Sequence, residues 1–125
     1  MDKKYLLTSL GYAILGLILG IYMAASKNHG QMVTHAHIML LGFVVSFIYA
    51  SIFKIWIKEY TSPLAVPQFI CHQVGTLFLL LSLFCLFGGI APEPMLRPIL
   101  AISSIVVLLG MILMKIIVIK AIKNT

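Results

Sequence analysis

The sequence has little charge and especially few acidic residues. Its 125 residues include only three Asp or Glu side chains, and all charged residues together make up 10% of the chain. Cysteine is scarce as well, because Cys71 and Cys85 are the only two. They would lie about 21 Å apart along one helix, at about 1.5 Å per residue, which excludes a disulfide between them within that helix. The low charge argues against an ordinary soluble domain.

Most of the chain is instead apolar. Apolar residues make up 62% of the chain, and the mean hydropathy is +1.11. A domain of this size has too little interior to hide so much apolar surface from water, so lipid must be its solvent. A hydrocarbon core of about 30 Å takes about 20 helical residues. The sequence therefore predicts four membrane spans, at about residues 5–25, 34–57, 64–90 and 96–122.

Short turn sequences separate these four spans. They contain Gly30, Pro63, Pro92 and Pro94, and connections this short make consecutive helices antiparallel neighbours. We expect an all-α fold, a single domain over residues 1–125 built as an antiparallel up-and-down four-helix membrane bundle.

The formal net charge of +6 is distributed as in a membrane protein. If the N-terminus lies inside, only Lys27 and Arg97 lie outside, and seven of the nine basic residues lie inside: Lys3, Lys4, Lys54, Lys58, Lys115, Lys120 and Lys123. This bias predicts that both termini are cytoplasmic. We expect an integral multi-pass protein of a bacterial or archaeal inner membrane, with no nucleic-acid partner.

Two histidines stand one residue apart at the start of the second predicted span, His35 and His37 in the segment Val-Thr-His-Ala-His-Ile-Met-Leu-Leu-Gly-Phe. Residues two apart in a helix point roughly 200° away from each other, so the two imidazoles cannot bind one metal side by side. Ionisable residues inside a membrane are costly and usually functional. We therefore expect at least one of the two to bind a metal ion or a haem iron.

The other two histidines are weaker candidates. His72 lies about two turns into the third predicted span, roughly 20 Å in depth from His37 by helical rise. A histidine hydrogen-bonded between helices explains His72 as well as a metal ligand does. His29 lies in the predicted outer loop, where a solvated histidine is the simpler interpretation and a ligand the alternative.

The motif His35-Ala36-His37, followed by Gly42, resembles the His-x-His helix of the haem-copper oxidase catalytic subunit and its nitric oxide reductase relatives. The segment 68–75 is similar to the next helix of that family, although Gln68 stands where the family has a histidine. Gly88-Gly89 with Pro94 and Arg97 loosely resembles the following loop. The whole chain is similar to one four-helix unit of that subunit, and to small four-span proteins of the same type.

This resemblance implies haem b, with His35 and His37 as axial ligands and with Arg97 and Lys27 available to the propionates. Because the two histidines face apart, a second ligand for the same iron would come from a neighbouring copy. We expect a homo-oligomer, a trimer by the family analogy and a dimer as second choice, together with a respiratory-chain redox partner.

The leading interpretation is therefore a membrane b-type cytochrome that transfers electrons or binds a diatomic gas such as O2 or NO. Whether the protein is an enzyme stays open at this stage. An oxidoreductase of the oxidase type would lack a proton pump, because Asp2, Glu59 and Glu93 all lie outside the predicted spans.

Two alternatives belong to other classes. The outer end of the second predicted span carries imidazoles and thioethers that suit copper(I), namely His29, Met32, His35, His37 and Met39, with Met23 nearby on the first span. The protein would then be a copper-binding membrane protein. In the other alternative it is a non-catalytic assembly subunit of a respiratory oxidase.

Overall fold

The computed structural model describes residues 1–57 and 62–124, and this part of the chain is helical without any strand. The elements are α1 (Asp2–Ser26), α2 (Met32–His37), η1 (Ile38–Val45), α3 (Ser46–Ile52), η2 (Phe53–Ile57), α4 (Ala65–Phe87) and α5 (Glu93–Lys123). The elements α2 to η2 follow one another without a break and form one rod, Met32–Ile57, which we call the second span. Four helices in the described residues are long and apolar enough to cross a membrane, as the sequence predicted: α1, the second span, α4 and α5.

The helix ends differ from the predicted spans by a few residues, for local reasons. The third span was predicted to reach residue 90, but α4 ends at Phe87, where Gly88 and Gly89 follow and Gly89 adopts a positive φ of 66°. The helix α5 begins at Glu93, ahead of the predicted residue 96, because Pro94 lies in its first turn, where proline is well tolerated.

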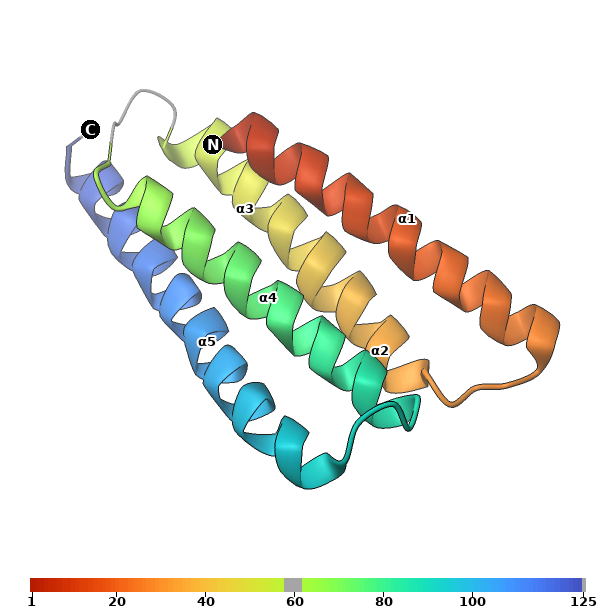
Figure 1. Ribbon diagram of the computed structural model, residues 1–125. Coiled ribbons are helices and arrows are strands. Elements are labelled where there is room, and N and C mark those ends of the chain that lie inside the picture. The colour runs from red at the N-terminus through yellow and green to blue at the C-terminus, as the bar shows by residue number, and fades with distance from the viewer. Residues whose placement is uncertain (58–61, 125) are drawn as a thin grey trace.

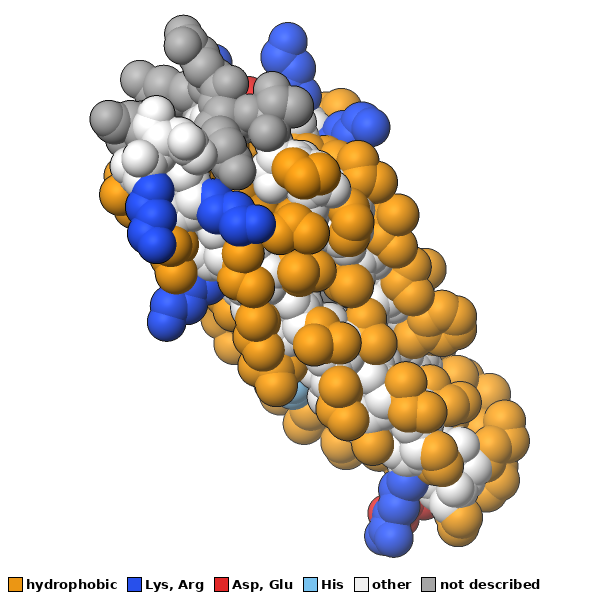
Figure 2. Space-filling view, turned by 90° about the vertical axis from the view of Figure 1, so that its left-hand side faces the viewer, with side chains coloured by type: hydrophobic (Ala, Val, Ile, Leu, Met, Phe, Trp, Pro, Cys, Tyr) orange, Lys and Arg blue, Asp and Glu red, His pale blue; other side chains and the backbone are white. Residues whose placement is uncertain are grey.

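The four helices lie side by side in the order α1, second span, α4, α5 (Figure 1). Both termini lie at one end of this row, and the connections 27–31 and 88–92 lie at the other. On the face seen in Figure 2, Lys and Arg side chains gather at one end, a basic and an acidic side chain meet at the other, and apolar side chains cover the surface between. This distribution matches a bilayer with its two polar surfaces.

The second span contains two π-helical segments, η1 and η2, which the sequence did not predict. In a π-helix the backbone hydrogen bond runs from residue i to i+5, and such turns are rare and often occur at functional sites. The segment η1 begins at Ile38, directly after His37. The wider turns change which side chains face a neighbouring helix, so helical spacing alone does not predict the contacts beyond this point.

Glycines allow the helices to approach one another closely. A Cβ at Gly75 of α4 would lie only 3.0 Å from the backbone nitrogen of Val107 in α5, and a Cβ at Gly110 would lie 3.3 Å from the backbone nitrogen of His72. Between α1 and the second span, the ring of Tyr12 covers Gly42, where a Cβ would lie 2.7 Å from the ring. Small residues serve this purpose in membranes, where packing rather than water exclusion holds helices together.

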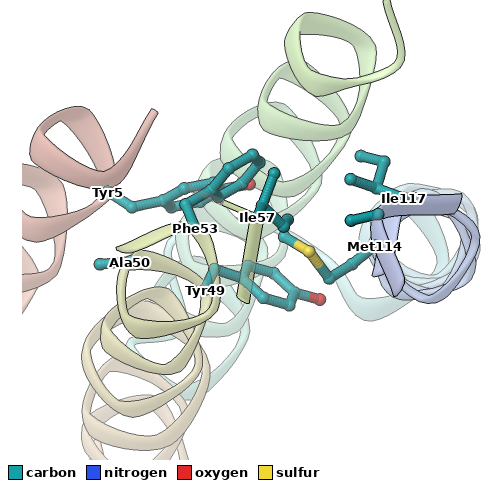
Figure 3. Close-up of a cluster of buried hydrophobic side chains, with 8 residues drawn as sticks. Tyr5, Tyr49, Ala50, Phe53, Ile57, Met114 and Ile117 are labelled. Atoms are coloured by element: carbon teal, nitrogen blue, oxygen red, sulfur yellow. The ribbon is translucent and has the colours of Figure 1, made fainter. Parts of the chain in front are cut away.

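The apolar core lies toward the end that carries the termini, where α1, the second span and α5 meet (Figure 3). The rings of Tyr5, Tyr49 and Phe53 pack together, and Met114 and Ile117 of α5 close the cluster from the opposite side. The ring centroids of Tyr5 and Tyr49 are 5.3 Å apart in an edge-to-face arrangement, which adds to the energy of burial.

The contact between α4 and α5 gives a test of this packing. We predict that Gly75→Ala lowers the free energy of unfolding by about 1–3 kcal/mol, because the new methyl group meets backbone that must shift. The control is Gly11→Ala on α1, where no atom lies within 4 Å of the added Cβ, so higher helix propensity should leave stability unchanged or raised by up to about 1 kcal/mol. Reversible unfolding in mixed detergent micelles measures both variants, and equal stabilities would contradict the close approach.

Candidate functional site

His35 lies between the second span and α1, and its imidazole is held by backbone. Its Nδ1 lies 2.8 Å from the carbonyl oxygen of Gly16. The ring covers Gly20, where a Cβ would lie 3.1 Å from Cε1 of the imidazole. Two small residues one helical turn apart on α1 therefore form the wall against which this half-buried ring rests.

His37 is held by its own helix. Its Nδ1 lies 2.8 Å from the carbonyl oxygen of Val33, one turn earlier, and its ring is half-buried. Both histidines belong to the regular α-helical segment α2, so the angle of roughly 200° between positions two apart applies to them. The structure thus brings His35 against α1, while His37 makes its hydrogen bond within the second span.

These two hydrogen bonds determine the chemistry of the rings. A carbonyl oxygen only accepts hydrogen bonds, so Nδ1 of each imidazole must carry the proton and donate it. In a neutral imidazole the other nitrogen, Nε2, then keeps its lone pair. Metal-binding histidines are commonly oriented in this way, with one ring nitrogen donating to a backbone carbonyl and the other bound to the metal.

The Nε2 atoms are also accessible. Within the described residues, only His72 Nδ1 and Thr76 Oγ1 are fully buried side-chain nitrogen or oxygen atoms without a hydrogen-bond partner. Nε2 of His35 and of His37 has no hydrogen bond to a described residue and is not among these buried atoms. Each lone pair can therefore be reached from the surface of the chain.

The predicted propionate partners, Arg97 and Lys27, come from different helices, α5 and the end of α1. Arg97 belongs to α5, and its Nε and Nη2 donate to Glu93 Oε1 at 3.1 and 2.8 Å, with 74% of its side chain exposed. Lys27 follows the last residue of α1 in a left-handed conformation with a φ of 56°. The side chain of Arg97 thus contacts Glu93, and the role of Arg97 and Lys27 at propionates stays a prediction.

The other residues predicted as copper(I) ligands differ in their exposure. His29 and Met32 are exposed, whereas Met23 is buried on α1. Met39 points at α1, where a Cβ at Gly16 would collide with its Sδ. No group of three or more His, Cys, Asp or Glu side chains that could hold a metal ion occurs in the described part of the chain. Because His35 donates to the Gly16 carbonyl and Met39 also contacts Gly16, a histidine and a methionine meet the same turn of α1.

A hollow of about 560 Å³ opens at this end of the molecule between α1 and α4. Its lining includes Tyr22, Gln31, Phe84 and Phe87, and neither His35 nor His37 is part of it. Gln31 links the start of the second span to α4, because its side-chain nitrogen donates to the Phe84 carbonyl at 3.0 Å. Its side-chain oxygen accepts from Thr34 of the same span at 2.7 Å.

His72 occupies a different, enclosed environment. It is fully buried, and its Nε2 lies 2.8 Å from Ser46 Oγ on the second span. The rings of Tyr49 and Tyr5 pack against it, with centroid separations of 5.0 and 5.8 Å. This arrangement is the histidine packed between helices that the sequence offered as one of two interpretations, and no side of the ring is open to a large cofactor.

A second buried polar group lies one turn from His72. Gln68 accepts a hydrogen bond from the Tyr5 hydroxyl through Oε1 and donates from Nε2 to the Gly110 carbonyl at 3.1 Å. It thereby links three helices, α1, α4 and α5. Sequence reasoning did not identify this link, although polar residues at 68, 72 and 76 recur every four positions in an apolar helix and mark one buried face.

Comparison of the chain with protein-family models, with curated proteins and with solved structures finds no match.

The polar link between three helices has a measurable consequence. We predict that Tyr5→Phe lowers the free energy of unfolding by about 1–3 kcal/mol, because it leaves Gln68 Oε1 buried without a donor. Tyr22→Phe removes the same hydroxyl from a side chain that is 55% exposed, and should change stability by less than about 0.5 kcal/mol. Unfolding of both variants in mixed micelles tests this, and a stable Tyr5→Phe protein would show that the link contributes little.

Proposed function

We propose that this chain is an integral membrane protein that binds haem b, with Nε2 of His35 and His37 as axial ligands. One observation carries the proposal: each imidazole donates its Nδ1 proton to a backbone carbonyl, at 2.8 Å in both cases, and leaves Nε2 unpartnered and accessible. This is the donor set and the orientation that haem iron uses in b-type cytochromes. It fits the resemblance of the His-x-His segment to the haem-copper oxidase helix.

The residues around the pair perform distinct tasks in this proposal. The Gly16 carbonyl fixes the tautomer and rotation of His35, and Gly20 provides the space for its ring. The Val33 carbonyl does the same for His37. Holding each imidazole in one orientation removes the entropy cost of ordering it on binding. Two imidazoles on one iron give a low-spin haem suited to electron transfer, whereas one imidazole leaves a position for O2 or NO.

The divergence of the two rings supports an assembly of several copies. His35 rests against α1 and His37 is bound within its own helix, so the pair cannot ligate one iron from both sides within one chain. His72 is enclosed and lies beside Ser46, well beyond His37 along the second span. In this proposal the second imidazole comes from a neighbouring copy in a homo-oligomer, a trimer by the oxidase analogy or a dimer, and a respiratory redox partner exchanges the electrons.

The membrane arrangement belongs to the same proposal. The four helices cross the bilayer in alternating directions, with both termini on the cytoplasmic side. The lysine bias supports this orientation, as does the position of both termini at one end of the molecule (Figure 1). The histidine pair then lies near the outer surface, because α2 starts just after the connection 27–31.

Copper binding is the second candidate, and one contact favours it. His35 and Met39 both meet α1 at Gly16, so an imidazole and a thioether, ligands that suit copper(I), approach the same place. Met23, on the same helix as Gly16, is buried. In the third interpretation, a non-catalytic assembly subunit, the histidines would bind nothing.

Haem content distinguishes these candidates. We predict that protein purified from haem-supplied cells gives a pyridine haemochrome spectrum of haem b, and that His35→Ala and His37→Ala each lose most of the haem. His29→Ala is the matched control, because this exposed histidine lies outside the helix and its loss should leave the haem content unchanged.

Each other result supports a different conclusion. Unchanged haem content in both His35→Ala and His37→Ala would reject the ligand assignment. A colourless protein that contains copper, lost in His35→Ala and Met39→Leu, would favour copper binding. A colourless and metal-free protein would leave the role of an assembly subunit.

A further inference from the structure

A groove lies at the opposite end of the molecule from the histidine pair, between the start of α1 and the last turns of the second span. Its volume is about 360 Å³. Apolar side chains form its walls, among them Leu6, Phe47, Ala50 and Ile55. Leu6, Phe47 and Ile55 are exposed at 39%, 46% and 52%, so the groove opens onto the surface that lipid would cover.

Two basic side chains from distant parts of the sequence converge on this groove. Lys3 of α1 and Lys54 of η2 both line it, and both are exposed. Neither forms an ion pair with another described residue; the ion pairs in the described part of the chain join Met1 to Asp2 and Arg97 to Glu93. Asp2 also lines the groove, and its carboxylate lies 3.9 Å from the amino group of Met1.

The groove therefore combines an apolar channel with two cations, neither of which forms an ion pair with a described carboxylate. Ser51 adds a hydroxyl oxygen at the same place; it donates its proton to the Phe47 carbonyl at 3.0 Å and keeps lone pairs that accept. The groove is therefore amphipathic: its walls are apolar, and its lysines make it cationic.

We propose that this groove is a binding site for one anionic phospholipid, with an acyl chain along Leu6, Phe47 and Ile55 and the phosphate between Lys3 and Lys54. The inference requires the four helices to lie in a bilayer and does not depend on haem. Charge complementarity selects this occupant: a second copy of the chain carries a net charge of +6 and would bring further lysines to the same end. A zwitterionic lipid would fill the channel without neutralising the lysines.

The test uses the whole protein in detergent, with native mass spectrometry during titration by phosphatidylglycerol or by phosphatidylcholine of the same acyl chains. We expect one phosphatidylglycerol per chain to bind more tightly than phosphatidylcholine. A lysine near a membrane surface contributes roughly fivefold in affinity, so Lys3→Gln with Lys54→Gln should weaken phosphatidylglycerol binding on the order of 20-fold. Both side chains are exposed, so the double variant should keep its fold.

The matched control is Lys120→Gln with Lys123→Gln, which removes the same charge from exposed lysines near the C-terminus, at the same end of the molecule but outside the groove. This control should retain the preference for phosphatidylglycerol. A second variant, Ser51→Phe, fills the groove and keeps both lysines, and should weaken binding of either lipid. Inorganic phosphate at millimolar concentration should not displace the lipid, because it lacks the acyl chain.

Three results would overturn the proposal. Equal loss in the two lysine double variants would show that general surface charge attracts the lipid. Equal affinity for the two lipids would show that the lysines do not select a headgroup. Displacement by inorganic phosphate would identify a simple anion site.

Discussion

The hydrogen bond from His35 to the Gly16 carbonyl is the interaction on which the histidine site depends. It requires α1 and the second span to approach closely, and this approach is possible because Gly16 and Gly20 have no side chains. The bond satisfies Nδ1 of His35, uses the second lone pair of a carbonyl within α1, and at the same time orients the ring. Helix packing and the orientation of the His35 ring are thus one structural feature in this protein.

The molecule separates two kinds of polar chemistry along its length. Near the connection 27–31, His35 and His37 present accessible Nε2 atoms. Toward the termini, His72, Gln68 and Tyr5 form an enclosed polar group whose hydrogen bonds join helices. The first arrangement leaves ring nitrogens available for a ligand, and the second uses most of its polar atoms for packing. This contrast is why the proposed function depends on the first pair and not on His72.

Hydropathy and turn residues predicted the helical class and the four membrane-length segments, because the bilayer sets the length of a span and lipid-facing residues must be apolar. The sequence also predicted that His35 and His37 face apart, which follows from the helical repeat within α2. The predicted end of α4 and the predicted start of α5 were each about three residues too late. Glycines after Phe87 end α4, and Pro94 in the first turn allows α5 to start early.

Other features depend on contacts that no single segment of sequence reveals. The π-helical turns of η1 and η2 lie in an apolar stretch whose residues do not distinguish them from an ordinary α-helix. The partner of His35 is a backbone carbonyl of α1, and a backbone atom has no residue type to mark it. The link from Tyr5 to Gln68 joins residues at opposite ends of a long sequence interval, and only the spacing of 68, 72 and 76 hinted at it.

Electron paramagnetic resonance of the oxidised protein, labelled with 15N-histidine, tests the central claim most directly. We expect a low-spin ferric haem signal with hyperfine coupling to imidazole nitrogen, and loss of most of that signal in His35→Gly. A haem signal without coupling to histidine nitrogen, or a signal identical in wild type and His35→Gly, would contradict it.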